Sequence, residues 1–138
     1  MGRAAALAAA AGLAAGAAGA TDATLGRIQF ALSCAQCHGV EGRGDGPLAE
    51  FLTTPPPDLT GLQRANGGVF PFAHVYATIE TGGGIGAHGA SEMPAWRERL
   101  VLEAWLRDGI AVPPEAQEGF ARARILALVD HIARLQEP

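Results

Sequence analysis

The sequence predicts an all-α domain in which three or four helices are separated by long loops. Apolar residues recur at the spacing of a helix face in four stretches, and no stretch alternates as a strand would. The 19 glycines and 9 prolines among 138 residues indicate extensive loops between those stretches. A hydrophobic fraction of 49% and a charged fraction of 17% argue against intrinsic disorder, and the length is that of one domain.

Residues 1–20 have the features of a secretory signal peptide. Arg3 supplies a positive charge before an apolar stretch, and Ala18-Gly19-Ala20 fits the small-residue cleavage pattern. We therefore expect cleavage after Ala20 and an exported mature domain, residues 21–138, without a membrane span. The alternative is a retained N-terminal anchor, which is disfavoured because the apolar run is shorter than the ~20 residues that span a bilayer.

The first helix of the mature domain is expected over residues 21–35, with Thr21 or Asp22 as its cap. Its expected apolar face, at spacing i, i+3 and i+7, consists of Leu25, Ile28 and Leu32. A glycine- and proline-rich segment follows over residues 39–68, which is long for a loop inside a compact domain. Such a loop is compatible with a compact domain if a large buried cofactor organises it.

Three more helices are expected over residues 71–81, 95–108 and 115–136. Pro71 suits the start of the first, and the glycines from Gly82 onward would end it. The expected apolar faces are, in chain order, Phe72, Val75, Tyr76 and Ile79; then Leu102, Trp105 and Leu106; then Ile125, Leu128, Val129, Ile132 and Leu135. The expected i, i+4 ion pairs of the last helix are Glu118–Arg122 and Asp130–Arg134.

The motif that indicates chemistry is Cys34-Ala35-Gln36-Cys37-His38, the C-x-x-C-H pattern of covalent haem attachment. Two thiols on one helical turn can add to two vinyl groups of a porphyrin, and His38 then offers an imidazole to the iron. A structural zinc site would need a second ligand pair, which the remaining histidines, His74, His88 and His131, do not form. A thioredoxin-like dithiol would need a βαβ context, and none is visible.

The expected second axial ligand is Met93. Once Met1 leaves with the signal peptide, Met93 is the only methionine, and its segment GGGIGAHGASEMP is too rich in glycine and polar residues for a core role. Thioether sulfur is a soft ligand, and a Met/His ligand pair raises the reduction potential of haem. His88 is the alternative ligand.

Together these residues resemble a class I cytochrome c, the small monohaem family. The resemblance covers residues 24–136, and its motifs are Gly26-x-x-x-Phe30 before CAQCHG, then GRGDGP, PPPDLTGL, EMPAW and LVDHIARLQ. It implies a fold in which the first and last helices cross near right angles, with Gly26 permitting close approach. It also implies that the Pro57 carbonyl accepts the imidazole N–H of the haem ligand and that Leu59 packs on the haem.

The chain departs from that family pattern in two places. His131 occupies the position at which the family usually places an aromatic residue against the first-helix glycine, and residues 97–117 form a longer segment than expected. Elsewhere Trp96 is expected to pack against haem or core. Arg64, or Asn66, is expected to bond a haem propionate, because a buried carboxylate needs a partner.

The predicted function is periplasmic electron transfer by one covalent haem c cycling between Fe(III) and Fe(II), without enzymatic activity of its own. We expect a monomer that docks briefly with donor and acceptor redox proteins. Nucleic-acid binding is not expected, because the net charge is −4, or −5 without Arg3, and no basic patch is present. One alternative is a fixed subunit of a periplasmic oxidoreductase, using residues 97–117 as its interface. Another is a gas-binding sensor or enzyme in which Met93 dissociates.

Overall fold

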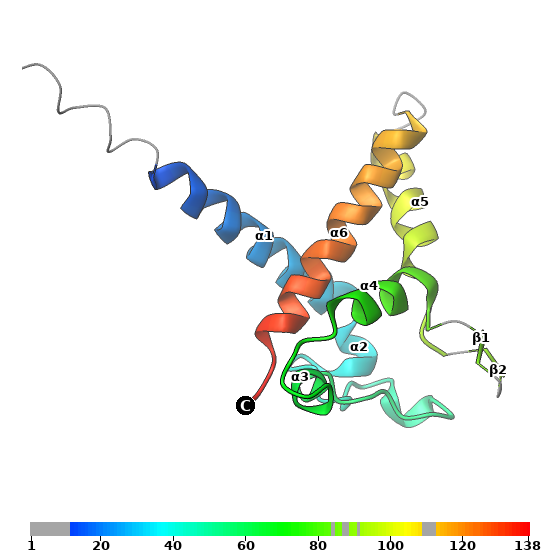
Figure 1. The fold of residues 1–138 in the computed structure, drawn as a ribbon. Coiled ribbons are helices and arrows are strands. Elements are labelled where there is room, and N and C mark those ends of the chain that lie inside the picture. The colour runs from blue at the N-terminus through cyan, green and yellow to red at the C-terminus, as the bar shows by residue number, and fades with distance from the viewer. Residues whose placement is uncertain (1–11, 84, 87–88, 91, 109–112) are drawn as a thin grey trace, which may run out of the picture.

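The computed structural model describes residues 12–83, 85–86, 89–90, 92–108 and 113–138. The elements are α1 (Gly12–Ser33), α2 (Ala35–His38), the short 3-10 helix η1 (Ala49–Phe51), α3 (Leu62–Ala65), α4 (Phe72–Thr81), β1 (Ile85–Gly86), β2 (Gly89–Ala90), α5 (Trp96–Asp108) and α6 (Pro114–Arg134). The two strands form one short antiparallel ladder. The predicted all-α class is confirmed (Figure 1).

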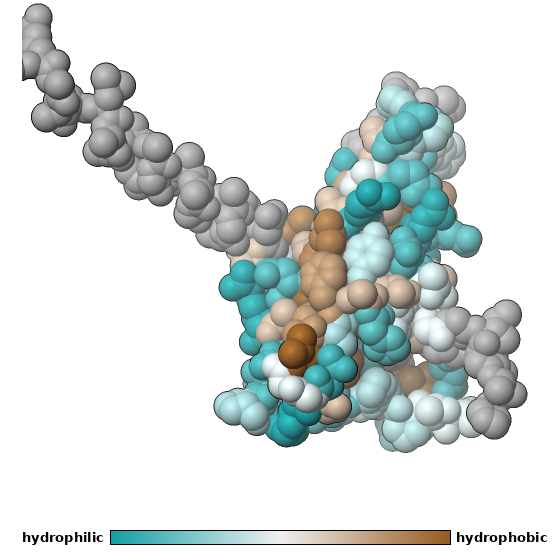
Figure 2. Space-filling view, viewed as in Figure 1, coloured by the Kyte–Doolittle hydropathy of each residue, from teal (hydrophilic) through white to brown (hydrophobic). Residues whose placement is uncertain are grey.

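Helix α6 is the centre of the packing. It contacts α1, α4 and α5, crossing α1 and lying beside α5 (Figure 1). Its predicted apolar face is confirmed, and the residues that carry it are Ile125, Leu128, Val129 and Ile132, which are buried, and Leu135, which is partly buried. Apolar surface is visible along the middle of α6 near its crossing with α1, whereas the far end of the α5–α6 pair is mainly hydrophilic (Figure 2).

The predicted apolar face of the first helix is wrong. Ile28 and Leu32 are 45% and 70% exposed, and Leu25 is only partly buried. In the part of α1 whose burial is described, residues 23–33, the buried residues are Gly26, Gln29 and Phe30. The contact with α6 is made where Gly26 lets two backbones approach, so a glycine rather than the aliphatic spacing selects the buried face. Gln29 tolerates burial because its amide donates to Ser33 Oγ at 2.8 Å and accepts from Arg124 at 3.0 Å.

Helix α1 also begins earlier than the sequence predicts. It runs from Gly12 without a break, so positions 21 and 22 lie inside the helix and not at its start. Within the described part of the chain, no helix combines the length and the apolar character that a membrane crossing requires.

Helix α5 likewise buries a different face from the predicted one. Leu102, Trp105 and Leu106 remain 53%, 42% and 68% exposed. The buried row is Trp96, Leu100 and Ala104, which follows the i, i+4, i+8 spacing of a helix face. This row includes the small residue Ala104, so hydrophobicity alone did not identify the buried face of α5. In α4 the prediction is largely confirmed, because Val75 and Ile79 are buried, although Phe72 is half exposed.

Candidate functional site

The C-x-x-C-H motif forms a single helical turn at the end of α1. Cys34 N–H donates to the Phe30 carbonyl at 2.8 Å, which continues the α1 ladder, and His38 N–H donates to the Cys34 carbonyl at 2.9 Å. The turn therefore brings together the side chains of Cys34, Cys37 and His38. The cysteines are free thiols rather than a disulfide, and Cys34 is buried in the apolar core.

The pKa of the Cys34 thiol bears on the possible uses of the motif. Burial, helped by the neighbouring Cys37, raises the pKa of the Cys34 thiol to about 12. A redox-active dithiol needs a depressed pKa, because the thiolate is the nucleophile. The raised pKa therefore argues against a thioredoxin-like role. The described residues also contain no cluster of three or more His, Cys, Asp or Glu side chains suited to a metal ion such as zinc.

The imidazole of His38 is held as a neutral ring. It is buried, and burial lowers its pKa. Its Nδ1 lies 3.4 Å from the Pro57 carbonyl oxygen. A neutral imidazole that donates through Nδ1 keeps its Nε2 lone pair available for a metal.

Partly buried apolar side chains extend the core cluster to which Cys34 belongs. They pack against the core cluster, and they are Leu59, Leu62, Phe70, Tyr76, Met93, Val101 and Leu135. Leu59 is fixed by its own N–H, which donates to the Gly42 carbonyl at 2.7 Å. A largely apolar surface with a few polar groups is typical of a site for a large flat cofactor.

The backbone around Met93 is held by contacts with two other segments of the chain. A Cβ at Gly82 would lie 2.6 Å from the Met93 carbonyl oxygen and 2.7 Å from Ala95 N, so the end of α4 abuts the chain around Met93. On the other side the Glu92 carboxylate accepts N–H bonds from Thr53 at 3.0 Å and Thr54 at 2.8 Å, which lower the pKa of Glu92. The alternative ligand His88 lies outside the described residues.

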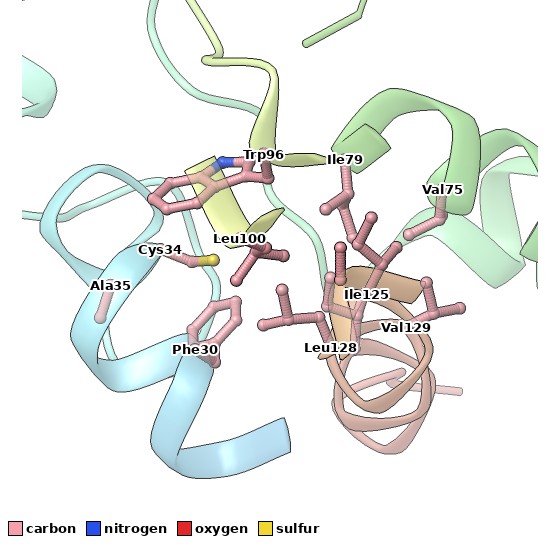
Figure 3. Packing of buried hydrophobic residues seen from close by; sticks show 12 residues of the cluster. Phe30, Cys34, Ala35, Val75, Ile79, Trp96, Leu100, Ile125, Leu128 and Val129 are labelled. Atoms are coloured by element: carbon pink, nitrogen blue, oxygen red, sulfur yellow. The ribbon is translucent and has the colours of Figure 1, made fainter. Parts of the chain in front are cut away.

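Trp96 supplies the observation that tests whether a haem fits. Along one side of the core, Trp96, Cys34 and Phe30 lie in succession, with Leu100 beside them (Figure 3). Among the described side chains, the indole Nε1 of Trp96 is a buried polar atom without a hydrogen-bond partner. Leaving such a donor unsatisfied costs about 1–3 kcal/mol. A haem, which is flat, apolar and edged by carboxylates, matches this surface and its unused donor.

A comparison with protein-family models matches residues 23–108 to the cytochrome c family. The match covers more than half of the chain and includes both the C-x-x-C-H turn and Met93. The chain belongs to the cytochrome c family. This cytochrome therefore has the all-α cytochrome c fold, and its family is one of haem-binding electron-transfer proteins. Neither the comparison with curated proteins nor the comparison with solved structures found a match.

The family match ends at Asp108, before α6 begins. In the cytochrome it is nevertheless α6 that packs across α1, with Gly26 at the crossing and His131 beside it. The segment over residues 97–117, expected to be an addition to the family pattern, consists mainly of α5 and of the start of α6.

The residues expected to bond a haem propionate have other partners in the structure. Arg64 is exposed, and its Nη1 donates to the Pro138 carbonyl at 2.9 Å. The Asn66 amide donates to the Val69 carbonyl at 2.8 Å. A propionate contact through Arg64 or Asn66 stays a prediction.

Sequence reasoning missed Glu92, Thr53 and Thr54. Glu92 accepts hydrogen bonds from the backbone N–H groups of Thr53 and Thr54, which lie 39 and 38 positions earlier in the chain. Because every non-proline residue has a backbone N–H group, no sequence pattern indicates such bonds. The only available signal was the position of this acidic residue directly before Met93.

Proposed function

We propose that this cytochrome is an exported electron carrier that holds one haem c through Cys34 and Cys37, with His38 and Met93 as the axial ligands. The observation that carries the proposal is the single helical turn that presents both thiols and a neutral imidazole beside the apolar core. A bound haem supplies the Fe(III)/Fe(II) couple.

Each proposed residue has a distinct task. Each thiol would add across one vinyl group, forming a carbon–sulfur bond while its proton goes to the second vinyl carbon. His38, oriented by Pro57, would bind the iron through Nε2. Met93 would complete the ligand set, and its soft sulfur favours the ferrous state. Trp96 Nε1 is a donor available to a haem carboxylate.

Electron transfer is the chemistry that the proposed ligands favour. If His38 and Met93 both held the iron, no coordination position would remain for a substrate, and outer-sphere electron exchange would be the accessible chemistry. We infer export from the signal-peptide features of residues 1–20. The acidic net charge of −4 favours a redox partner with a neutral or basic docking patch.

The deciding experiment is expression of the full chain, leader included, in a bacterium that matures c-type cytochromes. We expect a haem that resists acid–acetone extraction, a low-spin ferric spectrum with a sulfur-to-iron charge-transfer band, and a mature N-terminus at Thr21. Replacing both cysteines with serine should abolish covalent attachment. Met93→Ala should remove the charge-transfer band, whereas Leu102→Ala, on the exposed side of α5, should retain it. Absence of covalent haem in the parent protein would overturn the proposal.

A second candidate function is a fixed subunit of a periplasmic oxidoreductase. The observation that favours it is the outer face of α5, where Leu102, Trp105 and Leu106 leave apolar surface exposed. Native mass spectrometry of the protein isolated from its own cells at endogenous level distinguishes the two. A stoichiometric complex indicates a subunit, whereas a free monomer indicates a carrier.

A further inference from the structure

One short stretch of the loop between η1 and α3 contacts both sides of the candidate haem site. At its start, the Glu92 carboxylate accepts the N–H of Thr53 at 3.0 Å on Oε1 and the N–H of Thr54 at 2.8 Å on Oε2. Three residues after Thr54, the Pro57 carbonyl oxygen lies 3.4 Å from His38 Nδ1. The stretch, residues 53–57, thus joins the residue next to Met93 to the imidazole of His38.

The sequence makes this stretch stiff. Residues 55–57 are three consecutive prolines, each with its φ fixed by the ring, and such runs favour an extended conformation with little freedom. We call residues 53–57 the proline segment. A movement at its Glu92 end is therefore transmitted toward Pro57 rather than absorbed by the intervening backbone.

The proline segment is also braced along its length. A Cβ at Gly44 would overlap the Pro56 carbonyl oxygen, so the backbone of Gly44 lies directly against it. Just beyond the segment, Leu59 N–H donates to the Gly42 carbonyl at 2.7 Å, and Asp58 accepts from Thr60 N–H at 2.8 Å. These contacts fix the Pro57 end, and Glu92 makes the two bonds from the Met93 loop to the other end.

We propose that Glu92 is a positioning residue that fastens the Met93 loop to the proline segment and so keeps Met93 on the iron. The inference rests on the proposed function, because it takes Met93 as the axial ligand. Glu92 is exposed, and so are Thr53 and Thr54. Water can replace each partner in the unfolded chain, so the two bonds contribute little to global stability. Their effect is instead on the position of Met93, the residue that follows Glu92.

The test is the rate at which imidazole binds to the ferric holoprotein. At high imidazole concentration the observed binding rate reaches a limit set by the rate of Met93 dissociation. This limiting rate measures how firmly the Met93 loop is held in place. Glu92→Gln replaces one acceptor oxygen with a donor that faces an N–H group. We expect it to raise the limiting rate by a factor of about two to five, because water replaces part of an exposed charge-assisted hydrogen bond. Glu103→Gln, an exposed charge neutralisation on α5, is the matched control and should keep the parent rate.

A second variant removes the donor of the hydrogen bond between Thr54 and Glu92 instead of its acceptor. Thr54→Pro deletes one N–H donor without changing the charge, at a position that already precedes a proline. We expect the same direction of change as in Glu92→Gln. Because both variants break the same contact, the double variant should be no faster than the faster single variant. Additive effects would contradict a shared mechanism.

The outcomes separate the two proposals. If the parent protein lacks the sulfur-to-iron band, Met93 is not the ligand and the proposed ligation fails. If the band is present but Glu92→Gln keeps the parent rate, only the positioning role of Glu92 is overturned. If Glu92→Gln and Glu103→Gln raise the rate equally, the effect is one of net charge, and the positioning role is again overturned.

Discussion

The backbone of Gly26 on α1 lies directly against the carbonyl group of Ala127 on α6. A Cβ at position 26 would overlap the Ala127 oxygen, lie 2.9 Å from its carbonyl carbon and lie 3.0 Å from His131 Cβ. Because α6 contributes more residues to the core cluster than any other element, this crossing fixes how α1, and with it the C-x-x-C-H turn, sits on the rest of the molecule. Any larger residue must push the two helices apart.

Replacing Gly26 with alanine should therefore destabilise the protein by about 1–3 kcal/mol, the usual range for overpacking a tight contact. Guanidinium unfolding of the holoprotein, followed by circular dichroism, measures the change. Gly119→Ala is the matched control, because Gly119 lies on α6 with no neighbour within 4 Å of its added Cβ. There the helix should gain about 0.5–1 kcal/mol. A loss of the same size in both variants would contradict the role of the crossing.

The positions of α4, α5 and α6 were predictable from the sequence, but the start of α1 and the buried faces of α1 and α5 were not. In α6, large aliphatic residues carry the contact, so the periodicity of hydrophobic residues identifies the face. In α1 the backbones approach closely at Gly26, and in α5 the buried row includes Ala104. Hydrophobicity scores give such small residues little weight. A helix that buries a small residue at its contact can leave its own leucines exposed to solvent, as α1 does with Leu32 and α5 does with Leu106.

His131 should make the stability of the protein depend on pH. Its ring packs on Phe30 with centroids 5.0 Å apart. Burial chiefly, then the charges of Arg27 and Arg134, lower its pKa, with Asp130 opposing them. The unfolded chain, with an imidazole pKa of about 6.5, then binds the proton first as pH falls. The contribution of the neutral ring is present above that value and is lost progressively below it.

His131→Phe should remove this part of the pH dependence while keeping a ring against Phe30. We expect the difference in unfolding free energy between pH 7.5 and pH 5.5 to shrink in the variant, measured by urea unfolding at both pH values. His74→Phe, on the exposed side of α4, controls for exchanging a histidine for an apolar ring. An unchanged difference in His131→Phe would show that the ring does not titrate between the folded and unfolded states.

Gly82→Ala should disturb Met93 ligation through the backbone. Gly82 has φ +74° and ends α4 with its N–H on the Thr78 carbonyl at 2.8 Å, and its added Cβ would lie 2.6 Å from the Met93 carbonyl oxygen. Gly68→Ala is the matched control, since φ is +87° there but nothing lies within 4 Å. Both variants carry the left-handed strain of about 1–2 kcal/mol. Only Gly82→Ala should weaken the ferric sulfur-to-iron band, and retention of a full band in it would contradict the contact.

The candidate site was predictable as far as it is local in sequence. Cys34, Cys37 and His38 lie on one helical turn, and their spacing alone indicates their common use. The contacts that bring the Met93 loop to this turn are made by backbone groups far along the chain, as at Glu92 and Thr54. Such contacts depend on the path of the loops, which proline and glycine content limits but does not specify.

The partner of Glu118 differs from the one predicted by helix spacing. Glu118 Oε1 lies 2.6 Å from Arg97 Nη2 on α5, so the ion pair joins two helices instead of bracing α6 against Arg122. Because both side chains are about half exposed, the coupling should be small, about 0.2–1 kcal/mol. A double-mutant cycle on Arg97→Gln and Glu118→Gln should find it at low ionic strength and lose most of it in 1 M salt. The parallel cycle on Glu118 and Arg122 should give a coupling near zero. A larger coupling there would restore the i, i+4 pair as the one present in solution.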